Sequence, residues 1–408
     1  MKELLLLLLL SHEYFLILLS LGVFFLTLFL LPRIRENSLK LGFTDTPNSR
    51  SSHSDIVPTF GGVAFYAAFI FMLFLTQRFD ENNLTITLIA SLTVMFFIGL
   101  KDDLQNLSAK KKFIGQLIAV FILMFHSGFR IYSFHGFLGI EDIPLILSLP
   151  LSSFLLLGLL NAYNLIDGID GLASIVGIVI ASSFGFLFYK LELWYYLAIC
   201  ITTISMLFAF LRFNFSTKKK IFMGDTGSLL IGLVLGLLTM KLLSLGSGTF
   251  SEIAISRQEI PLLILCILII PTFDISRVMF IRLNRKKSIF SADRNHIHHI
   301  LIDSGLSHKK ASLLVGLINL CIIGVMYFSI KNYGVFFSMF LLFVLILFLI
   351  FFFFIMNKTY TTKKTKVKIR NLLFKYFSFF TTNNKSISKN IQKNNFKQKL
   401  KSFGIFFY

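Results

Sequence analysis

Acidic and amide side chains gather in three short polar stretches of an otherwise apolar chain. The first stretch contains the adjacent pair Asp102 and Asp103, followed by Lys112. Two neighbouring carboxylates at the end of a helix point about 100° apart, so they can serve different partners, such as a cation and a substrate proton. A charged pair at the boundary of a membrane helix is more often simply solvated. The pair alone therefore does not predict catalysis.

The second stretch, 161–171, is the richest in oxygen ligands and contains no Lys or Arg. Its two Asn and two Asp residues offer hard oxygen donors, and its two glycines let a ligand approach the backbone. One Asp-Gly pair is enough to make a tight turn. The doubled pattern, Asp167-Gly168 and Asp170-Gly171, favours a ligand site instead.

The third stretch, 218–228, contains three lysines and then Asp225 flanked by glycines. Gly227 and Ser228 are expected to begin an apolar helix, whose free amides and positive dipole end would face a bound phosphate. Asp225 would hold the Mg²⁺ of that phosphate, since Mg²⁺ is usually bound through one or two carboxylates and phosphate oxygens. A helix cap alone needs only Asp or Ser, so the extra glycines favour a site.

A fourth, basic stretch ends in three histidines, His296, His298 and His299. Arg and Lys are expected in any cytoplasmic loop, but three histidines in four residues are not. Zinc is disfavoured because no Cys or fourth ligand is evident nearby and the basic loop repels a metal. Histidines that donate to phosphate or sugar oxygens fit these surroundings better.

The elements that must position these residues are membrane-spanning helices. The chain is 55% hydrophobic and 15% charged, whereas a soluble domain has about a quarter charged residues. Its 50 Phe exclude a disordered chain. A spanning helix needs about 20 apolar residues, and we count eleven candidates. The expected fold class is an all-α polytopic membrane protein with spans near 13–32, 59–76, 84–100, 113–129, 145–160, 172–189, 194–211, 228–245, 261–281, 312–330 and 336–356.

Lys and Arg predict the orientation of the chain, because cytoplasmic loops retain them. One set of connections (33–58, 101–112, 161–171, 212–227, 282–311 and 357–408) holds 32 of the 40 basic residues. That set is therefore expected to be cytoplasmic, with the N-terminus outside. All four stretches lie on the cytoplasmic side. A secondary transporter would want its carboxylates along the spans, so an ion-coupled transporter is the less favoured alternative.

Two regions are expected: a transmembrane catalytic domain, 1–356, and a cytoplasmic tail, 357–408. The tail carries 13 basic residues and no Asp or Glu. Such a tail suits the anionic inner leaflet better than nucleic acid, because it lies beneath a membrane domain. The three cysteines lie inside apolar segments, so neither disulfides nor a zinc site are predicted.

The four stretches together resemble the polyprenyl-phosphate N-acetylhexosamine-1-phosphate transferase family. The resemblance runs from about Arg33 to Gly305 and includes Asp45 to Arg50, His53 and Gln116. It implies transfer of N-acetylhexosamine-1-phosphate, GlcNAc-1-phosphate first among the options, from a UDP-sugar to undecaprenyl phosphate. UMP would be released, and surface polysaccharide synthesis would begin at the cytoplasmic face of the bacterial inner membrane.

The resemblance also implies roles for individual residues. Asp225 and Asn164 match metal ligands for Mg²⁺, with Mn²⁺ as an alternative. Asp102 and Asp103 match a catalytic pair, one of which acts as a base towards the lipid phosphate or aligns Lys112. Lys112, which would carry phosphate charge, and His298 complete the catalytic set, and Phe222 matches the aromatic residue on which uracil stacks. The full substrate-binding set is Asn161, Asp167, Gly168, Asp170, Phe222, Arg294, His296 and His299.

Some alternatives stay open at this point. The phospho-muramoyl-pentapeptide branch carries three consecutive histidines, and Ile297 interrupts them here, which favours the N-acetylhexosamine branch. A 6-deoxy-N-acetylhexosamine or phospho-muramoyl-pentapeptide donor remains an alternative, as does a homodimer. All of these readings require Asp102, Asn164 and Asp225 to meet at one end of the helices, within reach of one ion at about 2 Å per ligand.

Overall fold

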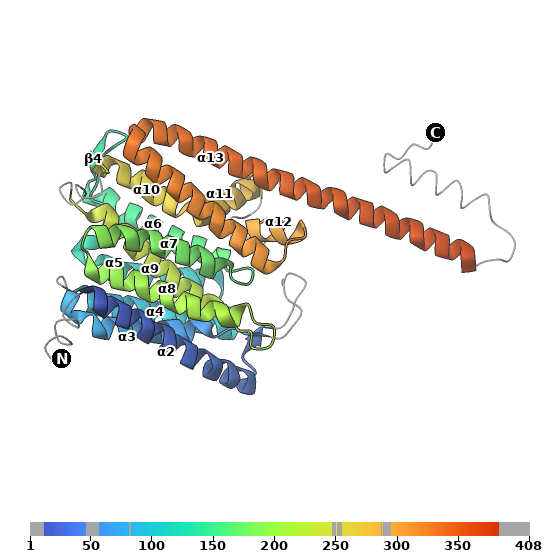
Figure 1. The fold of residues 1–408 in the computed structure, drawn as a ribbon, viewed down its shortest axis with the longest axis horizontal. Coiled ribbons are helices and arrows are strands. Elements are labelled where there is room, and N and C mark those ends of the chain that lie inside the picture. The colour runs from blue at the N-terminus through green and yellow to red at the C-terminus, as the bar shows by residue number, and fades with distance from the viewer. Residues whose placement is uncertain are drawn as a thin grey trace. The chain divides into compact units, whose positions relative to one another are not determined.

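The computed structural model describes residues 12–45, 57–80, 83–246, 250, 255–286, 288 and 295–382, and these are almost entirely helical (Figure 1). Within the described ranges, two short two-stranded antiparallel sheets interrupt the helices. β1 (Thr44–Asp45) pairs with β2 (Val57–Pro58), and β3 (Ser133–Phe137) pairs with β4 (Ile140–Asp142). The chain divides into two compact units, Met1–Met356 and Asn357–Tyr408.

The first unit contains nearly all the described helices. In chain order these are α2 (His12–Leu41), α3 (Gly61–Leu75), α4 (Leu84–Gln105), α5 (Ala109–Met124), α6 (Leu145–Ile166), α7 (Leu172–Lys190), α8 (Trp194–Asn214), α9 (Gly224–Ser244), α10 (Ile260–Ile267), α11 (Ile269–Asn284) and α12 (Ile297–Asp303). α13 (His308–Thr382) begins in the first unit and passes its boundary. Short 3₁₀ turns also lie between helices, namely η1 (Gln77–Phe79), η2 (Ser127–Phe129) and η4 (Arg257–Glu259).

The protein is a multi-pass membrane protein. Among the described residues, seven helices are long and apolar enough to cross a bilayer, or eight if the bent pair α10–α11 forms one span. The expected count of eleven is therefore not confirmed. α3 and α5 have only 15 and 16 residues, and the segments expected at 312–330 and 336–356 fall within the single helix α13. The direction in which the helices cross stays a prediction.

α13 reverses direction at Gly334, which has φ 74° and ψ −179°. The hydroxyls of Ser329 and Ser338 are 2.8 Å apart across this residue. In a straight helix nine residues would separate them by about 13 Å. The chain therefore folds back at Gly334, at the break expected between the last two apolar segments.

α9 is the central helix of the first unit. It contacts α3, α4, α6, α7, α8 and α10, and Figure 1 shows it among these neighbours. Every residue from Thr226 to Met240 is buried. A helix that is apolar all round is stable only when other helices surround it. The N-terminus of α9 therefore lies among the ends of the neighbouring helices.

The connections predicted to share one face do contact one another. Arg35, in the last third of α2, donates to the carbonyl oxygens of Lys218 and Lys220. The amide of Phe222 donates to the carbonyl oxygen of Pro58 at 2.8 Å. These bonds gather the ends of α2, α8 and α9, and the contacts of the site extend the same face to α4, α5, α6, α7 and α12.

Candidate active site

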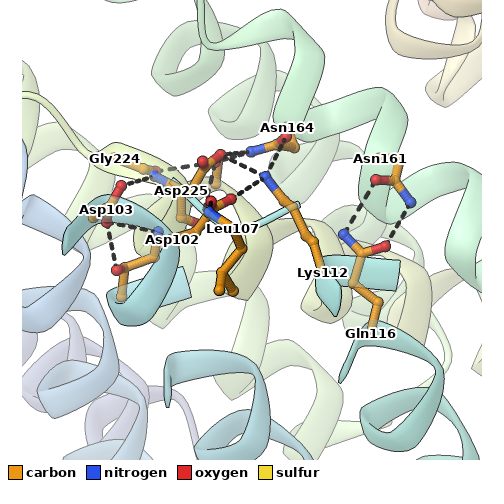
Figure 2. Close-up of polar contacts among 11 residues, drawn as sticks. Asp102, Asp103, Leu107, Lys112, Gln116, Asn161, Asn164, Gly224 and Asp225 are labelled. Carbon is orange, nitrogen blue, oxygen red and sulfur yellow. Dashed lines mark hydrogen bonds and ion pairs between the residues drawn. The ribbon is translucent and has the colours of Figure 1, made fainter. Parts of the chain in front are cut away.

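The ammonium group of Lys112 stands at the centre of the site (Figure 2). Its Nζ lies 2.9 Å from Asp102 Oδ2, 3.0 Å from Asp225 Oδ1 and 3.5 Å from Asn164 Oδ1. These side chains come from the ends of α4, α5, α6 and α9. Asp102, Asn164 and Asp225 therefore meet at one place, as the sequence required.

Asp102 is held by the turn that joins α4 to α5. The amide of Leu107 donates to Asp102 Oδ1 at 2.6 Å, and Asn106 ends α4 in a left-handed conformation. A short bond from a backbone amide to a carboxylate fixes the side chain as well as neutralising part of its charge. Asp102 Oδ2 is thereby aimed at Lys112, which lies in the first turn of α5.

Asp103 caps α9. Its Oδ1 accepts from the amide of Asp225 at 2.7 Å, and its Oδ2 accepts from the amide and the hydroxyl of Thr226 at 3.0 and 2.6 Å. A carboxylate at a helix N-terminus satisfies free amides and stabilises the positive dipole end. Gly224 has φ 70°, and a Cβ there would lie 2.2 Å from the oxygen of Thr59. Only glycine fits between the cap and the loop before α3.

The cap corrects one expectation. α9 begins at Gly224 rather than at Gly227 and Ser228, and the amide of Gly227 donates to the oxygen of Met223. The amides of Asp225 and Thr226 are taken by Asp103. A phosphate resting on the amides of Gly227 and Ser228 was therefore a wrong prediction, because these residues lie inside the first turns of the helix.

Two amide side chains of α6 take part in the site in different ways. Asn164 Nδ2 donates to Asp225 Oδ1 at 2.6 Å and to Ser228 Oγ at 2.7 Å. Asn161, one turn earlier, exchanges two hydrogen bonds with Gln116 of α5 at 3.1 and 3.0 Å. Asn161 thus joins α5 to α6, while Asn164 touches Asp225 itself.

The loop 167–171 lies between α6 and α7, and its two acidic residues differ in protonation. Burial, together with the negative charges of Asp225, Asp103 and Asp170, raises the pKa of Asp167 to about 8, although the residue keeps some solvent exposure. Burial alone would also raise the pKa of Asp170, but hydrogen bonds from His308 and Lys220 outweigh it and hold the value below the ordinary one. Asp167 is therefore mainly a neutral acid at pH 7, and Asp170 is a carboxylate.

The histidine segment is fixed by α11 and packs behind this loop. His296 Nδ1 lies 2.8 Å from Asp274 Oδ2, and the amide of Ile297 donates to Asp274 Oδ1 at 2.9 Å. The ring of His298 stacks on that of His296 and lies against Gly168, where a Cβ would be 2.2 Å from His298 Nε2. His299 stands beside His298, with ring centroids 4.3 Å apart.

Arg294, the remaining predicted member of this set, lies outside the described residues. Arg277 lies three residues after Asp274 on α11, a spacing that would allow the two side chains to pair. The structure instead gives the Asp274 carboxylate to His296 and the amide of Ile297, while Arg277 donates to the oxygen of Asn295. Both α11 residues hold the start of the histidine segment.

Phe222 is partly exposed in the loop before α9. Its amide donates to the oxygen of Pro58, and its own carbonyl accepts from the amide of Gly61. The ammonium of Lys220 lies 5.4 Å from the centroid of its ring. The backbone of Phe222, three residues before Asp225 in the sequence, is therefore fixed by a hydrogen bond at its amide and another at its carbonyl.

Three residues of the site were not predicted. Thr226 shares the cap with Asp103, and Lys220 and His308 both bind Asp170. Lys220 lay in a run of lysines that the positive-inside tendency already explained. His308 lies beyond the last stretch with a recognisable pattern. No local spacing could have found it, since 138 residues separate it from Asp170.

The donor set fits Mg²⁺. Within the described residues no group of three or more His, Cys, Asp or Glu forms a metal cluster, but two carboxylates and one amide oxygen converge on the Lys112 ammonium. These are hard oxygen ligands around a place where a cation already lies, and Mg²⁺ usually takes one or two protein carboxylates together with phosphate oxygens and waters. Asn164 now turns its NH₂ group to Asp225, so its amide would rotate to offer Oδ1 to a metal shared with that residue.

Comparison with known proteins identifies relatives over most of the chain. Residues 85–243 match the glycosyl transferase family 4. A probable undecaprenyl-phosphate N-acetylglucosaminyl 1-phosphate transferase of Bacillus subtilis (strain 168) is 30% identical over 318 residues, which are 78% of this chain and 85% of the relative. Undecaprenyl-phosphate alpha-N-acetylglucosaminyl 1-phosphate transferases of Yersinia pestis and Escherichia coli (strain K12) are 29% and 28% identical, over 69% and 72% of this chain and 76% and 79% of the relatives.

Proposed function

The chain belongs to glycosyl transferase family 4, and from that premise we propose that it transfers N-acetylhexosamine-1-phosphate from a UDP-sugar to undecaprenyl phosphate and releases UMP. The relatives are named as undecaprenyl-phosphate N-acetylglucosaminyl 1-phosphate transferases, so UDP-GlcNAc is the donor we favour. The observation that carries the proposal is the convergence of Asp102, Asn164 and Asp225 on Lys112.

The proposed reaction is an attack by a phosphate oxygen of the lipid on the β-phosphorus of the donor, with UMP as the leaving group. Phosphoryl transfer of this kind depends on positioning and on neutralising charge more than on covalent help from the protein. Lys112 would bind oxygens of the reacting phosphates once its ion pairs with Asp102 and Asp225 are exchanged for ligand contacts. Asp102 would then accept a proton from the lipid phosphate or align Lys112; a phosphate monoester is already mostly ionised at pH 7.

Asp225 and Asn164 would hold Mg²⁺, which when bound supplies positive charge to the donor diphosphate. Asp103 has both oxygens engaged in the α9 cap, so we assign it the task of fixing Asp225 rather than of touching substrate. Asp225 lies in the first turn of α9, and a fixed cap keeps its carboxylate aimed at Lys112.

The donor nucleotide would lie between Phe222 and the loop 167–171. The partly exposed ring of Phe222 offers a surface for uracil, since aromatic faces stack on bases irrespective of sequence. Asp167, being mainly protonated at pH 7, can donate a hydrogen bond without repelling the diphosphate. His298 and His299, packed behind Gly168, would close the sugar side, and His296 would hold that segment in place through Asp274.

We also propose the membrane arrangement in which this face is cytoplasmic. The positive-inside tendency supports it, since the connections at this end and the tail hold 32 of the 40 basic residues. The N-terminus would then lie outside and the basic tail 357–408 beneath the inner leaflet. Splitting α13 at Gly334 and counting α3 and α5 would bring the number of crossings to the expected eleven.

The test is a donor screen with the purified full chain in detergent. Radiolabelled UDP-GlcNAc, undecaprenyl phosphate and Mg²⁺ should yield UMP and a lipid-extractable label. Asp225→Asn should abolish this turnover, whereas Asp142→Asn, which removes an exposed carboxylate from β4, should keep it. Label transfer only from another UDP-amino sugar would reassign the donor. No transfer from any of them, together with solute flux into vesicles, would replace the enzyme by a transporter.

A further inference from the structure

Asp170 is held by two basic side chains that come from distant parts of the chain. Lys220 Nζ lies 2.6 Å from Asp170 Oδ2, and His308 Nδ1 lies 2.9 Å from the same oxygen. The three side chains are 14%, 21% and 22% exposed. Contacts this short at low exposure fix the position of a carboxylate, unlike those of an open surface ion pair.

The backbone around Asp170 is held as well. Ser312, one turn after His308 in α13, donates its hydroxyl to the carbonyl oxygen of Asp170 at 2.7 Å. The amide of Gly171 donates to the side chain of Asn214 at 2.6 Å, and the same Asn214 donates to the oxygen of Ile221 at 3.0 Å. Asn214 is 4% exposed. The loop 167–171 is therefore joined to the loop before α9 and to the first turn of α13.

Lys220 connects this cluster to the aromatic side of the site. Its ammonium, besides binding Asp170, lies 5.4 Å from the ring centroid of Phe222, within the range of a cation–π contact. A change in the position of Lys220 would therefore move both Asp170 and the environment of Phe222. These are the two sides between which the proposed donor nucleotide lies.

We infer that Lys220 and His308 are positioning residues for the nucleotide of the donor, acting through Asp170, and that the first turn of α13 is thereby a part of the donor site. The inference rests on the proposed function. It adds to it an element that lies outside the family match at 85–243, because α13 begins only at His308.

The arrangement leaves one carboxylate oxygen of Asp170 for a ligand. Lys220 Nζ and His308 Nδ1 both contact Oδ2, and within the described part of the chain no hydrogen bond or ion pair to Oδ1 is found. Two contacts on one oxygen fix the plane of the carboxylate, so the direction of Oδ1 is set before the sugar nucleotide arrives. Preorganisation of this kind strengthens binding because less freedom is lost when the ligand enters. It affects donor binding and leaves the reacting groups around Lys112 in place.

The experiment compares four variants of the full chain: His308→Ala, His308→Asn, Lys220→Met and, as the matched control, Lys310→Gln. Lys310 is an exposed lysine of the same turn of α13. Two quantities are measured for each, namely the affinity for UMP by calorimetry and the KM and kcat for UDP-GlcNAc in the transfer assay.

His308→Ala and Lys220→Met should each weaken UMP binding and raise the donor KM by about tenfold, which is the scale of one hydrogen bond to a charged group. Their kcat should change by less than about twofold, in keeping with a loss of uniform binding. His308→Asn keeps a donor near the place of Nδ1, and it should recover UMP affinity to within about threefold of the unmodified chain. Lys310→Gln should match the unmodified chain.

Three results would overturn the inference. These are unchanged UMP affinity and KM in both His308→Ala and Lys220→Met, a fall of kcat at constant KM, or no recovery in His308→Asn. If His308→Ala does not fold, Lys220→Met and His308→Asn still decide the matter. An unmodified chain that neither binds UMP nor transfers label would refute the proposed function and this inference with it. An active unmodified chain, with His308→Ala and Lys220→Met that behave like it, would refute the inference alone.

Discussion

Replacing Lys112 by Met should destabilise the protein in the absence of divalent cations. The ammonium lies between two carboxylates, at 2.9 Å from Asp102 and 3.0 Å from Asp225. Met has a similar length and keeps the apolar contacts of the side chain, but it removes the positive charge. The two carboxylates would then face each other without compensation.

The size of the effect follows from these distances. Two oxygens that both touch one ammonium are at most about 6 Å apart, and at an effective dielectric constant of about 20 two negative charges at that distance repel by roughly 3 kcal/mol. The side chain of Asp225 is 34% exposed, against 8% for Asp102, and solvent screens part of the repulsion. We therefore expect a loss of about 2 kcal/mol in the free energy of unfolding, below the 3–5 kcal/mol typical of a fully buried pair.

The assay is thermal unfolding of the detergent-solubilised chain in a chelating buffer and again in MgCl₂, with NaCl of equal ionic strength as the reference. The melting temperature of Lys112→Met should be several degrees lower in chelator, and MgCl₂ should raise it more than it raises that of the unmodified chain. Lys111→Met, at an exposed neighbour, should behave like the unmodified chain. Adding Asp102→Asn to Lys112→Met should restore stability. A Lys112→Met protein as stable as the unmodified chain in chelator would refute the electrostatic reasoning.

Three further predictions concern the donor side. Phe222→Ala should raise the donor KM about tenfold with little change in kcat, on the scale of one stacking contact; steady-state kinetics that show an unchanged KM would count against stacking. Gly168→Ala places a Cβ 2.2 Å from His298 Nε2 and should lower the unfolding free energy by about 1–3 kcal/mol as overpacking does, which a melting curve of the variant tests. Because the pKa of Asp170 is held below its ordinary value, its contribution to stability is complete above about pH 4, the unfolded value, and is lost as the pH falls through the folded value. The melting temperatures of the unmodified chain and Asp170→Asn should therefore converge in acid, and a constant difference down to pH 3 would contradict the assignment.

Local patterns in the sequence were enough to predict the helices. The runs near 84–100, 145–160, 172–189 and 194–211 each lie within one observed helix, because an apolar run of this length has no other stable conformation in a bilayer. Helix ends were less predictable. α9 begins four residues before the expected 228, because Gly224 and Asp225 belong to the helix only by virtue of the cap that Asp103 provides from 122 residues away.

The same division between local and distant determinants holds for the site. Asp102, Asn164 and Asp225 could be chosen from their own neighbourhoods, since each lies in a polar stretch at the end of an apolar run. The partners that fix them could not. Lys220 is the last of three consecutive lysines, and His308 precedes two more lysines, so neither stands out in its local sequence. Only the fold brings both side chains to one oxygen of Asp170.

The charges around Lys112 support the proposal that the chemistry uses a divalent cation. Asp102 and Asp225 pair with a single ammonium, which leaves a surplus of negative charge where two anionic substrates would meet. Asp167 adds little to this surplus, since its raised pKa keeps it mainly neutral at pH 7. The surplus nevertheless remains, and like charges in a site of low dielectric repel strongly. A divalent cation held by Asp225 and Asn164 would offset this surplus and, by taking the Asp225 carboxylate from Lys112, would leave the ammonium freer to bind phosphate. The carboxylates that pair with Lys112 are thus the groups that a cation of higher charge would bind.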